Sequence, residues 1–128
     1  MTNSDIVQQL ARDLAQVYTD AARAGSVDPS TVITTALPQL HSAATQAEVA
    51  MQHRLIVIGN EPENFRHAAD EAEALQLVAQ VSGKVGDLVE FATFHRQFRD
   101  VVSPEVLRKF LADLLALTAT ALRWVGDR

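Results

Sequence analysis

Apolar residues recur at intervals of three and four along most of this chain, which is the period of a helix with one buried face. In the first stretch, residues 4–24, polar residues between them would face water, namely Gln8, Arg12, Asp13, Gln16 and Asp20. The apolar positions are Ile6, Val7, Leu10, Leu14, Val17, Tyr18, Ala21 and Ala22. Thr2 or Ser4 can cap the first turn, and Gly25 can end the helix. The pattern therefore predicts an amphipathic helix over residues 4–24.

A second helix is predicted from residue 29 to about residue 53. Asp28 and Pro29 form a strong start signal, because the carboxylate caps free amides and a proline at the first helical position loses no needed donor. Pro38 lies inside the pattern, where it removes a hydrogen bond and clashes with the preceding turn. We therefore expect a kink or a split near Pro38. Residues 55–58 are β-prone, but one short strand has no partner elsewhere in the sequence, so they are interpreted as a helix end or an extended linker.

Two further helices are predicted, over about residues 65–98 and from Ser103 to Gly126. In the last helix Ser103 is a good N-cap and Pro104 suits the first position. One apolar line faces inward and consists of Leu107, Leu111, Leu114, Leu115, Thr118, Leu122 and Val125, and a second consists of Val106, Phe110, Leu117 and Trp124. A helix that is apolar on two sides is typical of a central or interface position. The sequence thus predicts an all-α bundle of four main helices that associates with other copies through a surface including Trp124.

The composition of the chain disfavours several classes of function. With 48% hydrophobic residues, 128 residues are enough for one compact domain, expected over residues 1–128. The net charge is −5, which disfavours a nucleic-acid partner, and no apolar run approaches the roughly 20 residues of a membrane span. The first ten residues lack the features of a secretion signal, so we expect a cytoplasmic protein. There is no cysteine, so a metal would need carboxylates or histidines. Charge is uneven, at −6 over residues 1–83 and +1 over residues 84–128. Such asymmetry can help copies associate or attract an anion to the second part, and it is also a common by-product of solvated helix faces.

The segment from Ser82 to Asp87 contains two glycines and a lysine, as phosphate-binding loops do. The full phosphate-loop pattern is absent, because valines stand where it needs a first glycine and a final Ser or Thr. We therefore expect Gly83 and Gly86 to lie on a helix at a point where a neighbouring helix approaches closely.

Two stretches, Gly83–Phe91 and Ser103–Leu117, together resemble the all-α NTP pyrophosphohydrolase superfamily, the MazG-like group. In that family one helix carries ExxE around a Val-Gly pair, and a later helix carries ExxD within a stretch like EELADVL. The resemblance covers about residues 70–126. It implies a helical bundle that assembles as a dimer or tetramer, with Mg²⁺ held by four acids and a nucleoside triphosphate cleaved between its α and β phosphates.

Matched position by position, the four family acids fall on Lys84, Asp87, Phe110 and Asp113. The resemblance implies Asp87 and Asp113 as catalytic groups and as Mg²⁺ ligands, and Glu90 can add a carboxylate one turn further on. Acids spaced by three on each of two packed helices converge on a hard cation, so the carboxylates of Asp87 and Asp113 should lie within about 10 Å of each other on neighbouring antiparallel helices. Lys84 and Arg96 are the candidate contacts to an anion such as a nucleotide.

A second group of polar residues is a weaker candidate for a metal site. His67, Asp70 and Glu71 share one helical face near a helix start, where acids are favoured by the helix dipole in any case. The acids Asp87 and Asp113 can equally be ordinary surface residues.

Two functions follow as hypotheses. The first is a divergent MazG-like nucleoside triphosphate pyrophosphohydrolase, either weakly active with Mg²⁺ or retaining only the fold. The alternative is a non-catalytic helical module for interaction or oligomerisation, with a regulatory or scaffold role, because the last helix is apolar on two sides. A homo-oligomer is expected in both cases, a nucleotide only in the first, and neither nucleic acid nor a membrane in either.

Overall fold

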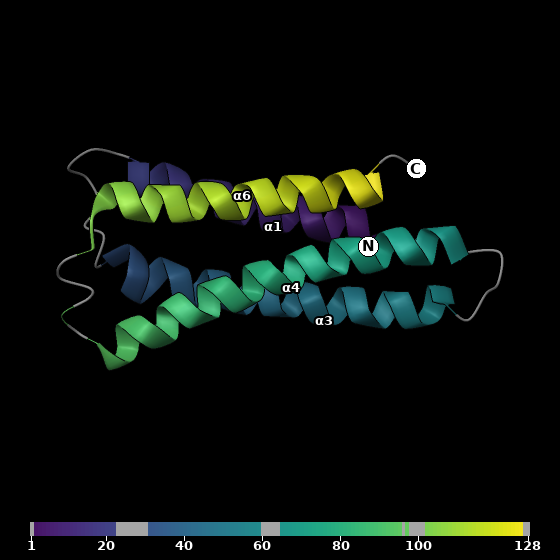
Figure 1. Cartoon of the computed structure of the whole chain (residues 1–128), viewed down its shortest axis with the longest axis horizontal. Coiled ribbons are helices and arrows are strands. Elements are labelled where there is room, and N and C mark those ends of the chain that lie inside the picture. Colours follow the sequence, from purple (N-terminus) through teal and green to yellow (C-terminus); the bar gives the residue numbers. More distant parts are fainter. Residues whose placement is uncertain (1, 23–30, 60–64, 96, 98–101, 127–128) are drawn as a thin grey trace.

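The computed structural model describes residues 2–22, 31–59, 65–95, 97 and 102–126, and every element in this part of the chain is helical. The elements are α1 (Asn3–Ala22), the π-helical stretch η1 (Val32–Ala36), α3 (Leu37–Gly59), α4 (Phe65–Phe94) and α6 (Pro104–Gly126). Figure 1 shows the long helices lying along one axis, with consecutive helices running in opposite directions. The predicted all-α bundle of four main helices is confirmed.

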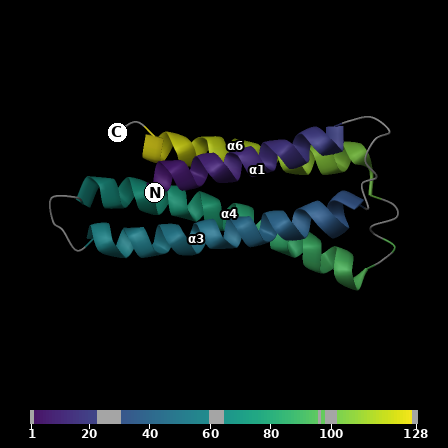
Figure 2. The same cartoon turned by 180° about the vertical axis from the view of Figure 1, so that it is seen from behind.

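Each long helix packs against two neighbours, so the bundle has four seams. Helix α3 packs on α1 and α4, and α6 packs on the same two helices from the other side, as Figure 2 shows from behind. The apolar positions spaced by three and four meet in one core. Its largest fully buried side chains are Val7, Leu10, Leu14, Ile33, Leu37, Met51, Val78, Val81, Val85, Leu107, Leu111 and Leu114.

Two of the predicted helix caps are present. At the start of α1 the Asp5 amide donates to Thr2 Oγ1 at 3.2 Å, and the Thr2 amide donates to Asp5 Oδ2 at 3.0 Å. This reciprocal pair is a capping box, and the Thr2 hydrogen bonds hold the pKa of Asp5 below its usual value. At the start of α6 the Glu105 amide donates to Ser103 Oγ at 3.1 Å. Of the two candidates at the first helix, Thr2 is therefore the cap.

The second helix divides at Pro38, as predicted. Before the proline the chain forms the wider π-helical turn of η1, and the Leu37 amide donates to Val32 O, five residues back. Proline has no amide hydrogen, and its ring clashes with the carbonyl four residues earlier in a regular α-helix. The wider turn moves that carbonyl away, so the helix axis continues into α3 with a local change of winding.

The other boundaries differ by a few residues from those predicted. Helix α3 continues to Gly59, so the β-prone residues 55–58 belong to the end of a helix. Helix α4 ends at Phe94, four residues before the predicted limit. The signals at Gly25, Asp28 and Pro29 lie outside the described residues. None of the described helices combines the length and apolarity that crossing a membrane requires.

Candidate functional site

The glycine-containing segment Ser82–Asp87 lies in the middle of α4, which is continuous from Phe65 to Phe94. A Cβ added at Gly86 would lie 2.7 Å from His41 Nε2 of α3, so this glycine allows the imidazole to pack against the helix backbone. A Cβ at Gly83 would meet nothing within 4 Å. The prediction of a close helix approach is therefore right for Gly86 and wrong for Gly83, whose exposed position faces away from the neighbouring helices.

The predicted site residues of α4 are all at the surface. Lys84, Asp87 and Glu90 are exposed. Asp87 and Glu90 line one shallow hollow of about 260 Å³, together with Phe91, Phe94 and His95. The first four of these residues come from the last turns of α4, and His95 directly follows the helix. Helix α4 diverges from α6 toward this end in Figure 1. The structure thus places Asp87 beside Glu90, and places aromatic rings rather than a third carboxylate next to them.

The second predicted acid, Asp113, lies on α6, which packs against α4 and runs antiparallel to it. Asp113 is exposed, and Phe110, at a ligand position of the family pattern, is half-buried against the core. Among the residues that the structure describes, no three His, Cys, Asp or Glu side chains are grouped so that they could hold a metal ion. Asp87, Glu90 and Asp113 are therefore not gathered into a metal site in the single chain. Arg96 lies outside the described residues.

Glu71 has a structural position that the sequence interpretation missed. It is only 7% exposed, and its carboxylate accepts a hydrogen bond from the side-chain amide of Asn3, which is also buried. The bond joins the first turn of α1 to α4. The sequence carried a signal for this burial, because Glu71 precedes Ala74 and Val78 by three and seven residues and so shares their buried face. The side chain of His67 lies outside the described residues.

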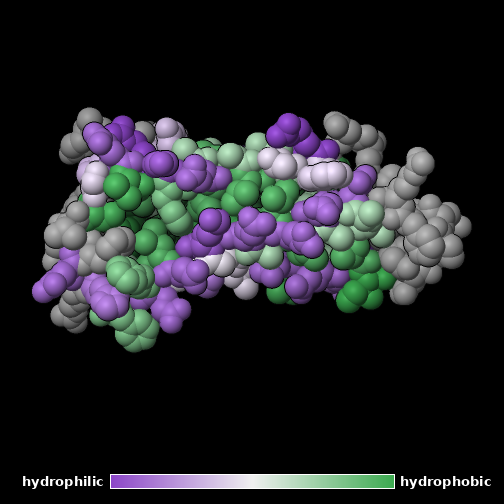
Figure 3. All heavy atoms as spheres, in the orientation of Figure 1, coloured by the Kyte–Doolittle hydropathy of each residue, from purple (hydrophilic) through white to green (hydrophobic). Residues whose placement is uncertain are grey.

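Helix α6 presents its two apolar lines differently. The inner line of Leu107, Leu111 and Leu114 is buried, as predicted. The second line, called here the outer line of α6, consists of Val106, Phe110, Leu117 and Trp124. Val106 is 60% exposed and Trp124 is 42% exposed, while the two residues between them are half-buried. Figure 3 shows apolar side chains gathered between rows of hydrophilic ones over α6 and α4.

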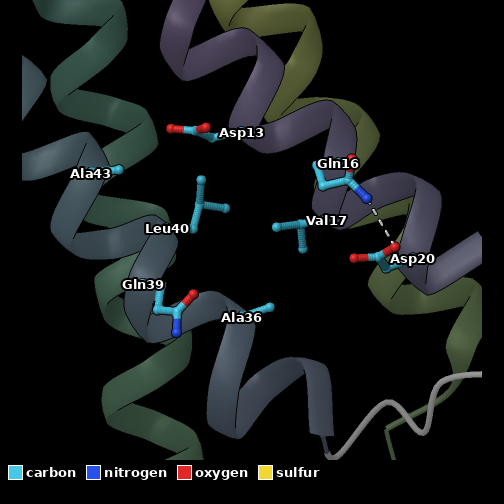
Figure 4. A pocket seen from close by; sticks show the side chains of 8 residues that line it. All are labelled: Asp13, Gln16, Val17, Asp20, Ala36, Gln39, Leu40 and Ala43. Carbon is cyan, nitrogen blue, oxygen red and sulfur yellow. Dashed lines mark hydrogen bonds between the residues drawn. The ribbon is translucent and has the colours of Figure 1, made fainter.

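A groove runs along the seam between α1 and α3, which is the least tightly packed of the four seams. It consists of two hollows of about 330 Å³ and 300 Å³, which adjoin because both are lined by Asp13 and Ala43. In the first hollow, Val17 of α1 and Leu40 of α3 point toward each other at the floor (Figure 4). The residues that line the whole groove are Ile6, Gln9, Leu10, Asp13, Gln16, Val17 and Asp20 of α1, Ala36 of η1, and Gln39, Leu40, Ala43, Gln46, Ala47 and Ala50 of α3.

The rim of this groove is polar and carries negative charge. Asp13 and Asp20 are half-buried, and each accepts a hydrogen bond from a glutamine four residues earlier, at 3.0 Å and 3.1 Å. None of the described residues lining the groove is Lys, Arg or His. The side formed by η1 and α3 is lined by half-buried alanines at intervals of seven, Ala36, Ala43 and Ala50. The groove is therefore a concave surface with an apolar floor and an anionic edge on α1.

Comparisons with protein-family models, with curated proteins and with solved structures gave no match for this chain.

Proposed function

We propose that this chain is a non-catalytic helical module whose function is to associate with copies of itself. The observation that carries the proposal is the outer line of α6, which flanks the buried line of the same helix and leaves Val106 60% and Trp124 42% exposed. Apolar side chains lined up at helical spacing on a surface favour contact with another protein over contact with water.

The arrangement at the predicted ligand positions supports a non-catalytic role. Lys84 places an ammonium group where the family pattern has a carboxylate, and an ammonium group has donors but no acceptor for a metal. Phe110 places an apolar ring at the second altered position, half-buried against the core. The remaining acids lie on separate helices at the surface. The Phe110 ring contributes to the packing of the bundle and to the outer line of α6, and it has no oxygen to serve as a ligand for Mg²⁺.

The mass of the protein in solution, measured by light scattering from low to high micromolar concentration, tests the proposal. We expect a mass that rises above the 14.0 kDa of one chain, and an earlier transition to the monomer for Val106→Asp. Val106 is mostly exposed, so this substitution removes the apolar contact without emptying the core. Ala112→Asp, at an exposed position on another side of the same helix, is the matched control. A wild-type mass that stays at one chain at high micromolar concentration would refute self-association.

A second candidate is the MazG-like pyrophosphohydrolase. It is favoured by one specific feature, because α4 and α6 pack as antiparallel neighbours and each carries one matched acid, Asp87 or Asp113, at the surface. In this proposal the two carboxylates hold Mg²⁺ beside a nucleoside triphosphate, with Glu90 as a further ligand and Lys84 and Arg96 contacting the phosphates. The test is release of pyrophosphate from a panel of nucleoside triphosphates with Mg²⁺. Activity that is lost in both Asp87→Asn and Asp113→Asn would support this second function, and absence of any Mg²⁺-dependent release would dismiss it.

A further inference from the structure

The α1/α3 groove and the outer line of α6 share one repeat. The half-buried alanines of the groove, Ala36, Ala43 and Ala50, are spaced by seven residues. The larger side chains of the outer line, Phe110, Leu117 and Trp124, are spaced by seven as well. At 1.5 Å per helical residue, each set spans about 21 Å. The two surfaces of one chain therefore have the same length and the same period.

From this match we infer that the outer line of α6 of one copy docks into the α1/α3 groove of a second copy, an inference that rests on the proposed function and names its contact. Large side chains at intervals of seven fit spaces left by small residues at the same interval, as knobs fit holes between packed helices. Leu117 then lies over Ala43 at the centre of the groove. Contact between two outer lines would instead bring one row of large side chains against another.

Charge supports the same pairing and sets its direction. The groove has carboxylates, Asp13 and Asp20, in the half that is lined by Ala36 and Ala43. Arg123 is exposed in the last turn of α6, next to Trp124. The first half of the outer line has exposed charges of both signs beside it, Lys109 and Asp113, which offset each other. Opposite charges meet when Trp124 lies toward Ala36 and Phe110 toward Ala50. In this orientation α6 of one copy runs parallel to α1 of the next.

The contact is between two different surfaces, so it is heterologous. Each copy offers one groove and one outer line, and association continues into a chain or closes into a ring. With a helix diameter of about 10 Å, a groove about 21 Å long offers on the order of 200 Å². This area is well below the roughly 800 Å² per partner of a stable complex, so the contact should be weak and concentration-dependent.

Two variants that each remove one surface test the inference. Ala43→Leu fills the centre of the groove and leaves the outer line intact, and Trp124→Ala removes the end of the outer line and leaves the groove intact. Each variant alone should require at least a tenfold higher concentration to associate than the wild type. Mixed in equal amounts, they should form a dimer that stops at twice the mass of one chain, since neither has a second usable surface. Circular dichroism and denaturant unfolding confirm that each variant is folded.

The tryptophan reports the contact directly. Trp124 is the only tryptophan in the chain, so in the mixture all the tryptophan emission comes from the Ala43→Leu copy. Its emission should shift to shorter wavelength only when Trp124→Ala protein is added. Full association of Ala43→Leu alone, or a mixture that stays monomeric while the wild type associates, overturns the pairing and leaves self-association by another surface standing. A monomeric wild type overturns both this inference and the proposed function.

Discussion

Helix α3 takes part in two seams, one closed and one open, although small residues line both. On the α4 side, Gly86 has no side chain and the imidazole of His41 packs against it. On the α1 side, Ala43 and its neighbours of the same spacing face a groove. The difference lies in the residue opposite, because a small residue closes a seam only where the facing helix supplies a side chain of matching size.

The hydrogen bonds of the two seams also differ, because they join two helices in the closed seam but not in the open one. In the closed seam the hydroxyls of Thr45 and Ser82 are 3.1 Å apart and form a hydrogen bond between α3 and α4. In the open seam the glutamines of α1 donate to aspartates of their own helix, so these bonds do not join α1 to α3. Bonds within one helix hold the rim in place but do not hold two helices together, which leaves the open seam accessible to another chain.

The largest difference in stability between the seams should appear when a leucine side chain is introduced into each. Gly86→Leu should lower the free energy of unfolding by about 1–3 kcal/mol, because the new side chain takes the space of the His41 ring. Ala43→Leu should leave stability unchanged or raise it, because the side chain enters the groove. Denaturant unfolding measures both.

Gly83→Leu is the matched control for Gly86→Leu, since a Cβ at Gly83 meets no neighbour within 4 Å and an exposed helical glycine is about 1 kcal/mol less favourable than a better helix former. A gain in stability at Gly83 with a loss at Gly86 attributes the loss to His41. Equal losses at Gly86 and Ala43 would mean that the two seams do not differ in packing.

The next effect should come from the hydroxyl pair of the closed seam. Ser82→Ala removes one partner of the Thr45 bond at a buried position, and should cost about 0.5–1.5 kcal/mol. Gln16→Ala removes the bond to Asp20 in the open seam, and should change stability by no more than about 0.5 kcal/mol. A double variant lacking both Thr45 and Ser82 hydroxyls should cost little more than Ser82→Ala alone. Costs that simply add would show that the two hydroxyls act independently.

The sequence was informative where one residue determines the local backbone, and less so where two helices must be compared. Pro38 marked the division of the second helix, and Ser103 marked the start of the last one, because caps and prolines act on their own turn. Gly83 and Gly86 look alike in sequence and differ only in what lies opposite. The alanines of the groove raised no expectation, because alanine suits a helix in any surroundings and the empty space depends on the residues of α1.

At the candidate site, too, the sequence could not predict what depends on the packing of two helices. The resemblance to a two-helix metal site leads us to expect Asp87 and Asp113 on neighbouring antiparallel helices, and α4 and α6 pack in this way. Which face of each helix they occupy depends on how the helices are rotated in the bundle, and both acids are exposed. Glu71 is the converse case, because it is a charged residue that is buried. The hydrogen bond to its carboxylate could not be predicted from neighbouring residues, since its partner, Asn3, is 68 positions away in the sequence.

The smallest effect should be the acid sensitivity of α1, the helix shared by the open seam and the capping box. The Thr2 hydrogen bonds lower the pKa of Asp5 in the folded chain. A lowered pKa means that the ionised carboxylate stabilises the fold at neutral pH, and that this contribution is lost as the pH falls through the folded-state pKa, below about pH 4. The difference in melting temperature between wild type and Asp5→Ala should therefore be present at pH 7 and should shrink by pH 2.5. Thr2→Ala removes the hydroxyl bond to Asp5 but keeps the bond from the Thr2 backbone amide, so it should weaken this pH dependence only in part. If the difference in melting temperature between wild type and Asp5→Ala is as large at pH 2.5 as at pH 7, the carboxylate charge does not stabilise the first turn of α1. The acid sensitivity of this helix then has another source.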